Sequence, residues 1–154
     1  MAIRVAINGF GRIGRLTYRA IHELGCDDIE VVAINNSGPI ETHAHLLRYD
    51  SIHGNFPGTV KTTKKGIDIG RGVVPFYAER NPANLPWKKL GIDIVLECTG
   101  AFNSTEKAMP HITATAATVF VRKVVILLSL NLFAVAQHRL GNRVRQWFWF
   151  LKNA

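Results

Sequence analysis

The chain reads Asn8-Gly9-Phe10-Gly11-Arg12-Ile13-Gly14-Arg15 between an apolar run, Ile3 to Ile7, and a segment of helical periodicity, Ile13 to Leu24. The glycines have the spacing G-x-G-x-x-G. This spacing is weak evidence alone, but between a strand and a helix it is typical of a turn that binds the phosphates of a dinucleotide. We therefore expect a dinucleotide-binding turn close to the start of the sequence.

Each glycine has a separate physical task in such a turn. Gly9 would make the tight turn after the strand, Gly11 would let the backbone approach a pyrophosphate, and Gly14 would let the helix pack closely on the sheet. The start of the helix would offer free N–H groups and a partial positive charge to the phosphates. The alternative is that the glycines only shape a turn from strand to helix.

The apolar segments predict an α/β fold with a mostly parallel sheet. Strands are predicted over Ile3–Asn8, Ile29–Asn35 and Ile92–Glu97, because β-branched runs of this kind suit parallel strands buried on both faces. The helix after the glycine turn should end at Gly25. Its buried face should consist of Ile13, Leu16, Ala20, Ile21 and Leu24.

The segments between the second and third strands are less regular. The pattern predicts a short helix over Thr42–Arg48, a loop over Asp50–Gly58, and strands in Thr59–Lys64 and Ile67–Glu79. These strands are expected to be broken by Gly66, Gly70 and Gly72, which suggests an antiparallel excursion.

The C-terminal third begins with a helix and then changes character. Ser104 is a candidate N-cap of a helix through about Thr113, which Pro110 is expected to kink or shorten. A further apolar strand is possible in Arg122–Leu128. Beyond it, the sequence is hard to place in a compact fold.

The charge distribution argues against a general nucleic-acid-binding protein. The net charge is +8, but residues 1–106 hold twelve Lys or Arg and eleven Asp or Glu, whereas residues 107–154 hold seven basic and no acidic residues. Two distant cysteines, Cys26 and Cys98, predict reduced thiols in a cytoplasmic protein. The apolar stretch Val124–Ala136 is too short to cross a bilayer, and the N-terminus carries no evident signal peptide, so no membrane partner is expected.

Three longer stretches resemble one family. They are Ile7-Asn-Gly-Phe-Gly-Arg-Ile-Gly-Arg15, Ala44-His-Leu-Leu-Arg-Tyr-Asp-Ser51 with His53-Gly54, and Asp93-Ile-Val-Leu-Glu-Cys-Thr-Gly100 with Phe102. In order and spacing they resemble the NAD-binding domain of phosphorylating glyceraldehyde-3-phosphate dehydrogenase of the bacterial type. Erythrose-4-phosphate dehydrogenase shares the pattern, so a fragment of that enzyme is an alternative.

The resemblance implies a Rossmann-type domain over residues 1–113, with a sheet that is incomplete at its C-terminal side. Residues 114–154 would form a divergent basic and apolar tail. Three explanations of this tail stay open: translation of a shifted reading frame, a genuine divergent segment, or a functional tail whose arginines and aromatics contact nucleic acid or a protein partner.

The resemblance also assigns cofactor-binding positions. Backbone groups at Gly11, Arg12 and Ile13 would face the pyrophosphate, Arg80 would lie near the adenine, and Thr99 with Gly100 would line the nicotinamide side. With the turn glycines and a residue after the second strand, the predicted NAD-binding set is Gly9, Gly11, Arg12, Ile13, Gly14, Asn36, Arg80, Thr99 and Gly100.

Asn36 bears on the choice of cofactor. The family commonly has Asn-Asp after the second strand, where the carboxylate accepts hydrogen bonds from the adenosine ribose, but this chain has Asn35-Asn36. A carboxylate repels a 2′-phosphate and a neutral amide does not. We expect NAD as the cofactor with NADP tolerated; the alternative is that Asn36 merely replaces the carboxylate as a partner of the ribose.

No catalytic or metal-binding residue is predicted. The family's chemistry needs a cysteine in a Ser-Cys-Thr-Thr-Asn-Cys stretch, with a nearby His, and that stretch does not occur in this sequence. Cys98 is expected to be a small core residue. Among the histidines, His22 is expected at the surface, His43 and His45 on different sides of a helix, and His111 without partners suggestive of a triad.

The sequence thus predicts the NAD(P)-binding part of a dehydrogenase, inactive by itself. The family is homotetrameric, but this chain is expected to lack the main assembly surfaces. The rival from a different class is a non-catalytic binding module that recruits a partner through its tail.

Overall fold

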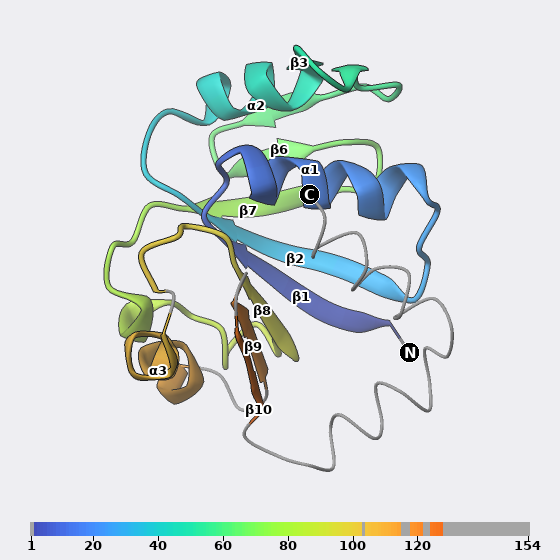
Figure 1. Ribbon diagram of the computed structural model, residues 1–154. Helices are drawn as coiled ribbons and strands as arrows, with labels where there is room; N and C mark the ends of the chain where they lie inside the picture. Colours follow the sequence, from blue (N-terminus) through green and yellow to red (C-terminus); the bar gives the residue numbers. More distant parts are fainter. Residues whose placement is uncertain (1, 103, 115–117, 122–123, 128–154) are drawn as a thin grey trace.

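The computed structural model describes residues 2–102, 104–114, 118–121 and 124–127, and Figure 1 shows their arrangement. Over these residues the chain forms an eight-stranded sheet in the order β10-β9-β8-β1-β2-β7-β6-β5 and a two-stranded sheet of β3 and β4. The strands are β1 Ile3–Asn8, β2 Ile29–Asn35, β3 Tyr49–Asp50, β4 Gly54–Asn55, β5 Lys61–Thr63, β6 Gly66–Asp68, β7 Val73–Tyr77, β8 Ile94–Glu97, β9 Thr118–Val121 and β10 Val124–Leu127. The helices are α1 Arg12–Glu23, α2 Ile40–Arg48, η1 Pro82–Asn84 and α3 Thr105–Ala114.

The centre of the sheet is parallel. β1 pairs in parallel with β2 on one side and with β8 on the other, β2 pairs in parallel with β7, and β8 with β9. The outer strands β10, β6 and β5 pair antiparallel with their neighbours. The prediction of a mostly parallel α/β sheet is therefore confirmed. β2 and β8 lie on opposite sides of β1.

Both faces of this sheet are covered by helices, as Figure 1 shows with α1 and α2 on one side and α3 on the other. Successive residues of a strand point to opposite faces, so Val5 and Ile7 pack with α1 and α2 while Ala6 packs with α3. Trp87, which is completely buried, fills the space on the α3 side. The mostly apolar sequences of β1 and β2, interrupted near their amino-terminal ends by the ion pair of Arg4 with Glu30, follow from this burial on two faces.

Helix α1 ends as predicted, but its buried face differs from the prediction. Gly25 has φ +61°, its N–H donates to the carbonyl of His22, and the N–H of Cys26 donates to the carbonyl of Ile21. These are the two hydrogen bonds of a glycine-terminated helix.

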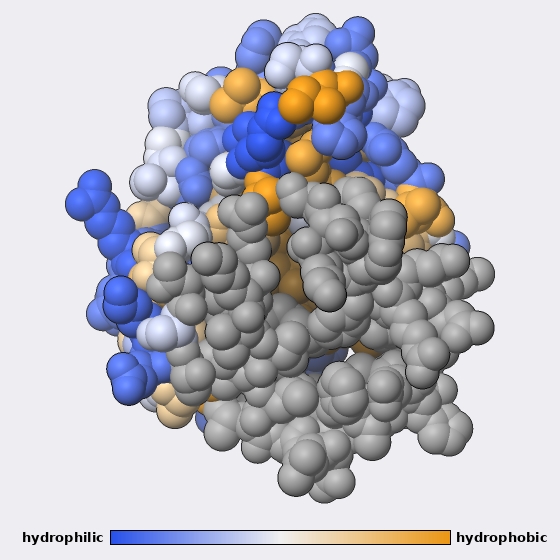
Figure 2. All heavy atoms as spheres, viewed as in Figure 1, coloured by the Kyte–Doolittle hydropathy of each residue, from blue (hydrophilic) through white to orange (hydrophobic). Residues whose placement is uncertain are grey.

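On the buried face of α1, Leu16 and Ile21 are buried as expected, whereas the unpredicted Thr17 and Tyr18 are also buried and Ile13 and Ala20 are half-buried. Leu24, expected on the buried face, is 69% exposed because it lies after the last helical residue. Figure 2 shows such hydrophobic residues scattered among hydrophilic ones on the described surface.

The irregular middle segment contains more elements than predicted. The predicted loop carries the short strands β3 and β4. The predicted break of Ile67–Glu79 at its glycines is confirmed, because Gly70 and Gly72 lie between β6 and β7. β6 turns back antiparallel to β7, so the antiparallel excursion is confirmed. The short helix begins at Ile40, two residues before the predicted start.

Pro110 does not shorten α3, which continues to Ala114. A proline in the helix interior removes one N–H donor, the one that would reach the carbonyl of Glu106. The remaining hydrogen bonds and the complete burial of Ala108 and His111 hold the helix against the sheet.

The segment after α3 adds to the sheet as far as it is described. β9 pairs with β8, and β10, which falls within the predicted strand Arg122–Leu128, pairs antiparallel with β9. The basic aromatic stretch near the C-terminus lies outside the described residues. The three explanations of the tail therefore stay predictions.

Candidate dinucleotide-binding site

The glycine turn lies at the point where the strand order reverses, between β1 and β8. The N–H of Gly9 donates to the carbonyl of Asn35 at 2.8 Å, and the N–H of Cys98 donates to the carbonyl of Asn8 at 2.7 Å. Gly9 has φ +94°, and a Cβ on it would lie 2.5 Å from the backbone nitrogen of Thr99. The segments after β1 and β8 therefore press together at the carboxyl edge of the sheet, where α/β folds bind their ligands.

The other two glycines differ in what surrounds them. A Cβ on Gly14 would lie 2.1 Å from the carbonyl oxygen of Gly9, whereas a Cβ on Gly11 would meet no atom within 4 Å. Gly14 thus allows α1 to sit on the turn, and Gly11 leaves open space at the start of the helix. These are the positions at which close packing and a close approach of a ligand are expected.

The start of α1 has donors to offer. The first helical hydrogen bond runs from the N–H of Arg15 to the carbonyl of Gly11, and Gly11, as N-cap, supplies no side chain. The N–H groups of Arg12, Ile13 and Gly14 therefore have no partner within the helix. Together with the helix dipole they favour an anion.

Two arginines add positive charge beside this turn. Arg12 is exposed, with its Nη2 4.0 Å from Oδ2 of Asp50. Arg15 donates from Nη1 to the carbonyl of Phe10 at 3.0 Å, and its burial lowers the pKa of its guanidinium. Arg12 is thus available near the predicted pyrophosphate position, while Arg15 braces the turn.

Asn36 is held at the end of β2 by three contacts. Its Oδ1 accepts the N–H of Phe10 at 2.9 Å, and its Nδ2 lies 2.6 Å from the carbonyl of Ser37 and 2.9 Å from Nε2 of His43. Because Oδ1 takes the Phe10 hydrogen, the amide orientation is fixed. One lone pair of Oδ1 remains for a ribose hydroxyl.

The segment after β7 carries the predicted adenine-side residue. The N–H of Glu79 donates to Oδ1 of Asn35, and Nδ2 of Asn35 donates to the carbonyl of Glu79, both at 2.9 Å. Asn35 thereby fastens this segment to the end of β2, and Arg80, the next residue, is exposed. The sequence did not single out Asn35 for this task.

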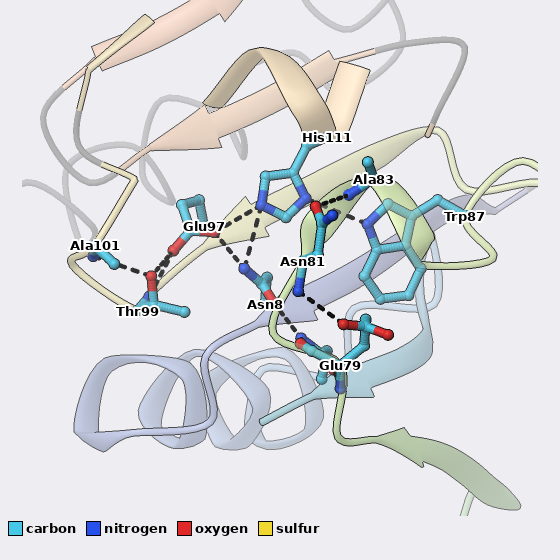
Figure 3. Close-up of polar contacts among 10 residues, drawn as sticks. Asn8, Glu79, Asn81, Ala83, Trp87, Glu97, Thr99, Ala101 and His111 are labelled. Atoms are coloured by element: carbon cyan, nitrogen blue, oxygen red, sulfur yellow. Dashed lines mark hydrogen bonds and ion pairs between the residues drawn. The ribbon is translucent and has the colours of Figure 1, made fainter. Parts of the chain in front are cut away.

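Thr99 and Gly100 form an exposed turn after β8, and Figure 3 shows the polar contacts beneath it. Thr99 donates from its N–H to Oε1 of the buried Glu97 at 2.7 Å. On the other oxygen of Glu97, Nε2 of the completely buried His111 lies at 2.9 Å. Sequence reasoning missed this pair because the two residues stand fourteen positions apart on different elements.

The histidine expectations have mixed outcomes. His43 is buried and His45 exposed, as predicted, but His22 is half-buried, with its ring 5.0 Å from that of Phe56. His111 has a carboxylate partner, Glu97, which the sequence did not indicate. The hydroxyl of Thr99 contacts the carboxylate and not the imidazole. The three groups therefore do not form a catalytic triad, in which the histidine lies between the nucleophile and the carboxylate.

Cys98, the last residue before Thr99, packs against the core cluster on the α1 side, which agrees with its expected role. Within the described ranges, no group of three or more His, Cys, Asp or Glu is arranged to hold a metal ion. No helix in the described part of the chain is both long and apolar enough to cross a membrane.

A surface hollow of about 470 Å³ lies elsewhere. It is bordered by the amino-terminal ends of β1, β2 and β7 and the second half of α1, and none of the nine predicted cofactor-binding residues lines it. The predicted residues instead follow one another along the carboxyl edge of the sheet. An extended dinucleotide lies across such an edge, so this edge is the better candidate.

Comparison with known proteins identifies similar sequences. The model of a family described as glyceraldehyde 3-phosphate dehydrogenase, NAD binding domain, matches residues 3–105. Glyceraldehyde-3-phosphate dehydrogenase of Xanthobacter flavus is 60% identical over 121 residues, covering 79% of this chain and 36% of that protein. The enzymes of the same name from Zymomonas mobilis, at 53% over 121 residues, and Thermotoga maritima, at 52% over 118, cover 79% and 77% of this chain. The chain spans 36% and 35% of the lengths of these two relatives.

Proposed function

The chain belongs to the glyceraldehyde-3-phosphate dehydrogenase family, and we propose that it binds NAD along the carboxyl edge of its sheet through the nine residues predicted from sequence. Residues 3–105 are the NAD-binding domain of that family. When bound, NAD supplies an acceptor for a hydride. The observation that carries the proposal is the open space at Gly11 beside the close contact of Gly9 with Thr99.

Each end of the cofactor would meet a different part of the edge. The N–H groups at the start of α1 would bind the pyrophosphate, and Arg12 would add positive charge. The remaining lone pair of Asn36 Oδ1 would accept a ribose hydroxyl, with Arg80 near the adenine. Thr99 and Gly100 would lie on the nicotinamide side, at the other end of the edge.

We also propose that NADP is tolerated. Asn36 is neutral, and its amide is held toward His43 and the carbonyl of Ser37, so no carboxylate stands at this position to repel a 2′-phosphate. Asn36 would still accept a hydrogen bond from a ribose hydroxyl of NAD, because its Oδ1 has a second lone pair besides the one that accepts the N–H of Phe10.

The proposal separates binding from aldehyde oxidation. The two cysteines lie at the end of α1 and at the end of β8. Cys98 packs against the core, and the buried His111 next to this edge contacts Glu97. We therefore propose that these 154 residues alone do not oxidise glyceraldehyde 3-phosphate, or erythrose 4-phosphate as the alternative substrate.

The remaining partner statements are also proposals. We propose a cytoplasmic protein that binds neither membranes nor nucleic acid and does not form a tetramer. Its organisation as a cofactor domain over 1–113 followed by a divergent tail, whose strands β9 and β10 extend the sheet, belongs with these proposals.

Calorimetric titration of the full chain with NAD and with ADP-ribose, which lacks the nicotinamide, tests cofactor binding. Saturable binding of both is expected, together with no NADH formation on adding aldehyde, phosphate and NAD. Absence of binding to either nucleotide would overturn the proposed cofactor site, and turnover would overturn the proposed inactivity. Light scattering of the same sample measures the oligomeric state.

A further inference from the structure

We propose that Glu97 is a positioning residue that fixes the turn at Thr99 and Gly100, and through it the nicotinamide end of the cofactor. The statement about the nicotinamide end rests on the proposed function above. Glu97 is the last residue of β8 and is 2% exposed. A carboxyl group this deeply buried is costly unless hydrogen bonds replace its contacts with water, so its partners define what it does.

Four hydrogen-bond donors surround the Glu97 carboxylate (Figure 3). Its Oε1 accepts both the N–H and the hydroxyl of Thr99. Its Oε2 accepts from Nδ2 of Asn8 and from Nε2 of His111. Each oxygen of Glu97 therefore takes part in two hydrogen bonds, and the carboxyl group is held on both sides.

The tautomer of His111 is fixed by Trp87. The indole N–H of Trp87, which can only donate, lies 3.4 Å from Nδ1 of His111. Nδ1 is therefore the acceptor, and Nε2 carries the hydrogen that Glu97 accepts. The 3.2 Å separation of Asn8 Nδ2 and His111 Nε2 is then a contact between two donors that share one carboxylate oxygen.

The Thr99 hydroxyl transmits this order to the turn. It gives its hydrogen to Glu97 and accepts the N–H of Ala101 at 3.1 Å. Gly100, between them, has φ +77°, a conformation that favours glycine. Glu97 thus holds Thr99 directly, and it holds Ala101 through the hydroxyl of Thr99.

The same carboxylate ends a line of buried amides along the carboxyl edge. Oδ1 of Asn8 accepts from Nδ2 of Asn35 at 2.6 Å, and Asn35 exchanges two hydrogen bonds with the backbone of Glu79. Each group's orientation is fixed by the next. The nicotinamide-side turn and the segment that carries Arg80 are therefore linked through the ends of β8, β1 and β2.

A glutamine at position 97 cannot reproduce this arrangement. It has nearly the same shape, but it offers one carbonyl oxygen and one NH₂ group. With the NH₂ group toward Thr99, it faces the backbone N–H of that residue; with the NH₂ group on the other side, it faces the donors of Asn8 and His111. The buried network then loses hydrogen bonds at one of its two ends.

Amide hydrogen exchange measured by NMR on the full chain tests the positioning without any ligand. In Glu97→Gln, exchange at Thr99 and Ala101 should be accelerated about tenfold, the equivalent of one lost hydrogen bond. Glu106→Gln, the same change at an exposed residue of α3, should leave both rates unchanged. Unchanged rates in Glu97→Gln would overturn the proposal.

A second pair of variants keeps the test decisive if Glu97→Gln does not fold. Thr99 is exposed, so Thr99→Val and Thr99→Ser should both fold. Thr99→Val loses the hydroxyl and should accelerate exchange at Ala101, whereas Thr99→Ser keeps it and should restore the parent rate. Equal rates in the two variants would contradict the proposed role of the hydroxyl.

Binding then tests the link to the cofactor. Glu97→Gln should weaken NAD about tenfold while ADP-ribose binding changes less than about twofold, because only NAD reaches the turn. Equal loss for both ligands, or no loss, would overturn the nicotinamide part. If the parent chain binds neither ligand, the proposed function fails, and the exchange rates alone decide whether Glu97 positions the turn.

Discussion

A Cβ on Gly14 would lie 2.1 Å from the carbonyl oxygen of Gly9. The first turn of α1 therefore rests directly on the backbone of the turn that follows β1. Gly9 in turn lies against the backbone of Thr99, so helix, turn and the end of β8 meet without intervening side chains. This three-part contact defines the geometry of the cofactor edge.

Gly14→Ala should destabilise the chain. Alanine favours a helix interior over glycine by about 1 kcal/mol, but the new methyl group would overlap a backbone oxygen, and such overpacking costs about 1–3 kcal/mol or more. The overlap is expected to dominate. Urea unfolding measures the change; a midpoint equal to or above that of the parent would contradict it.

Gly11→Ala, in contrast to Gly14→Ala, should affect cofactor binding more than stability. The new Cβ meets no atom within 4 Å, and the backbone at Gly11, with φ −72° and ψ −161°, is open to alanine. Because alanine is a poorer N-cap than glycine, the unfolding free energy should fall by only about 0.5–1 kcal/mol. NAD affinity should fall about tenfold, because the methyl group occupies the space where the pyrophosphate approaches. Unchanged affinity in a folded variant would place the phosphates elsewhere.

Asn36→Asp should increase the preference for NAD over NADP. The parent is expected to bind the two with similar affinity, whereas a carboxylate facing the 2′-phosphate should weaken NADP by about tenfold or more. Competitive titration of both cofactors against both proteins gives the ratio. A strong preference for NAD in the parent would mean that Asn36 acts as a ribose partner only.

Asp50 should contribute stability that is lost in acid. The N–H groups of His53 and Ile52 both donate to its Oδ1 at 2.9 Å and hold the pKa of this carboxyl well below its usual value of 3.8. A carboxyl whose pKa is lowered by folding stabilises the chain above its unfolded pKa and loses that effect as the pH falls toward the folded value. The contribution is thus complete near neutral pH and declines below about pH 4.

Urea unfolding of Asp50→Asn between pH 3 and 7 checks this. The variant should be less stable than the parent at pH 7, with the difference narrowing below pH 4. Asp27→Asn is the control, because the Asp27 side chain is 91% exposed and its carboxylate pairs with the exposed Arg71. A difference between parent and Asp50→Asn that is constant over this range would contradict the prediction.

Local sequence patterns predicted the elements on which the site stands. The bounds predicted for Ile3–Asn8 and Ile29–Asn35 are the observed ones, because strands buried largely on both faces are rich in β-branched and apolar residues. The third strand begins two residues later than predicted, at Ile94, because the N–H of Ile92 closes a turn onto Trp87. Apolar composition could not separate that turn from the strand.

The contacts between elements were harder to predict. His43 and His45 could be assigned to different sides of α2, since helical spacing alone separates them. The partners of His111 could not be assigned in this way. Glu97, Trp87 and Asn8 come from three other segments and meet His111 only when α3 packs on the sheet.

By itself the sequence determined the parallel α/β plan, the glycine turn and the family, because these depend on periodicity and on residues close together in the chain. The tertiary structure alone decided that Gly14 rests on Gly9, that Asn36 is oriented by Phe10, and that Glu97 holds Thr99 from beneath. The reason is physical: a strand's pattern is set by its own burial, whereas a buried hydrogen bond exists only once separate segments have brought a donor to an acceptor.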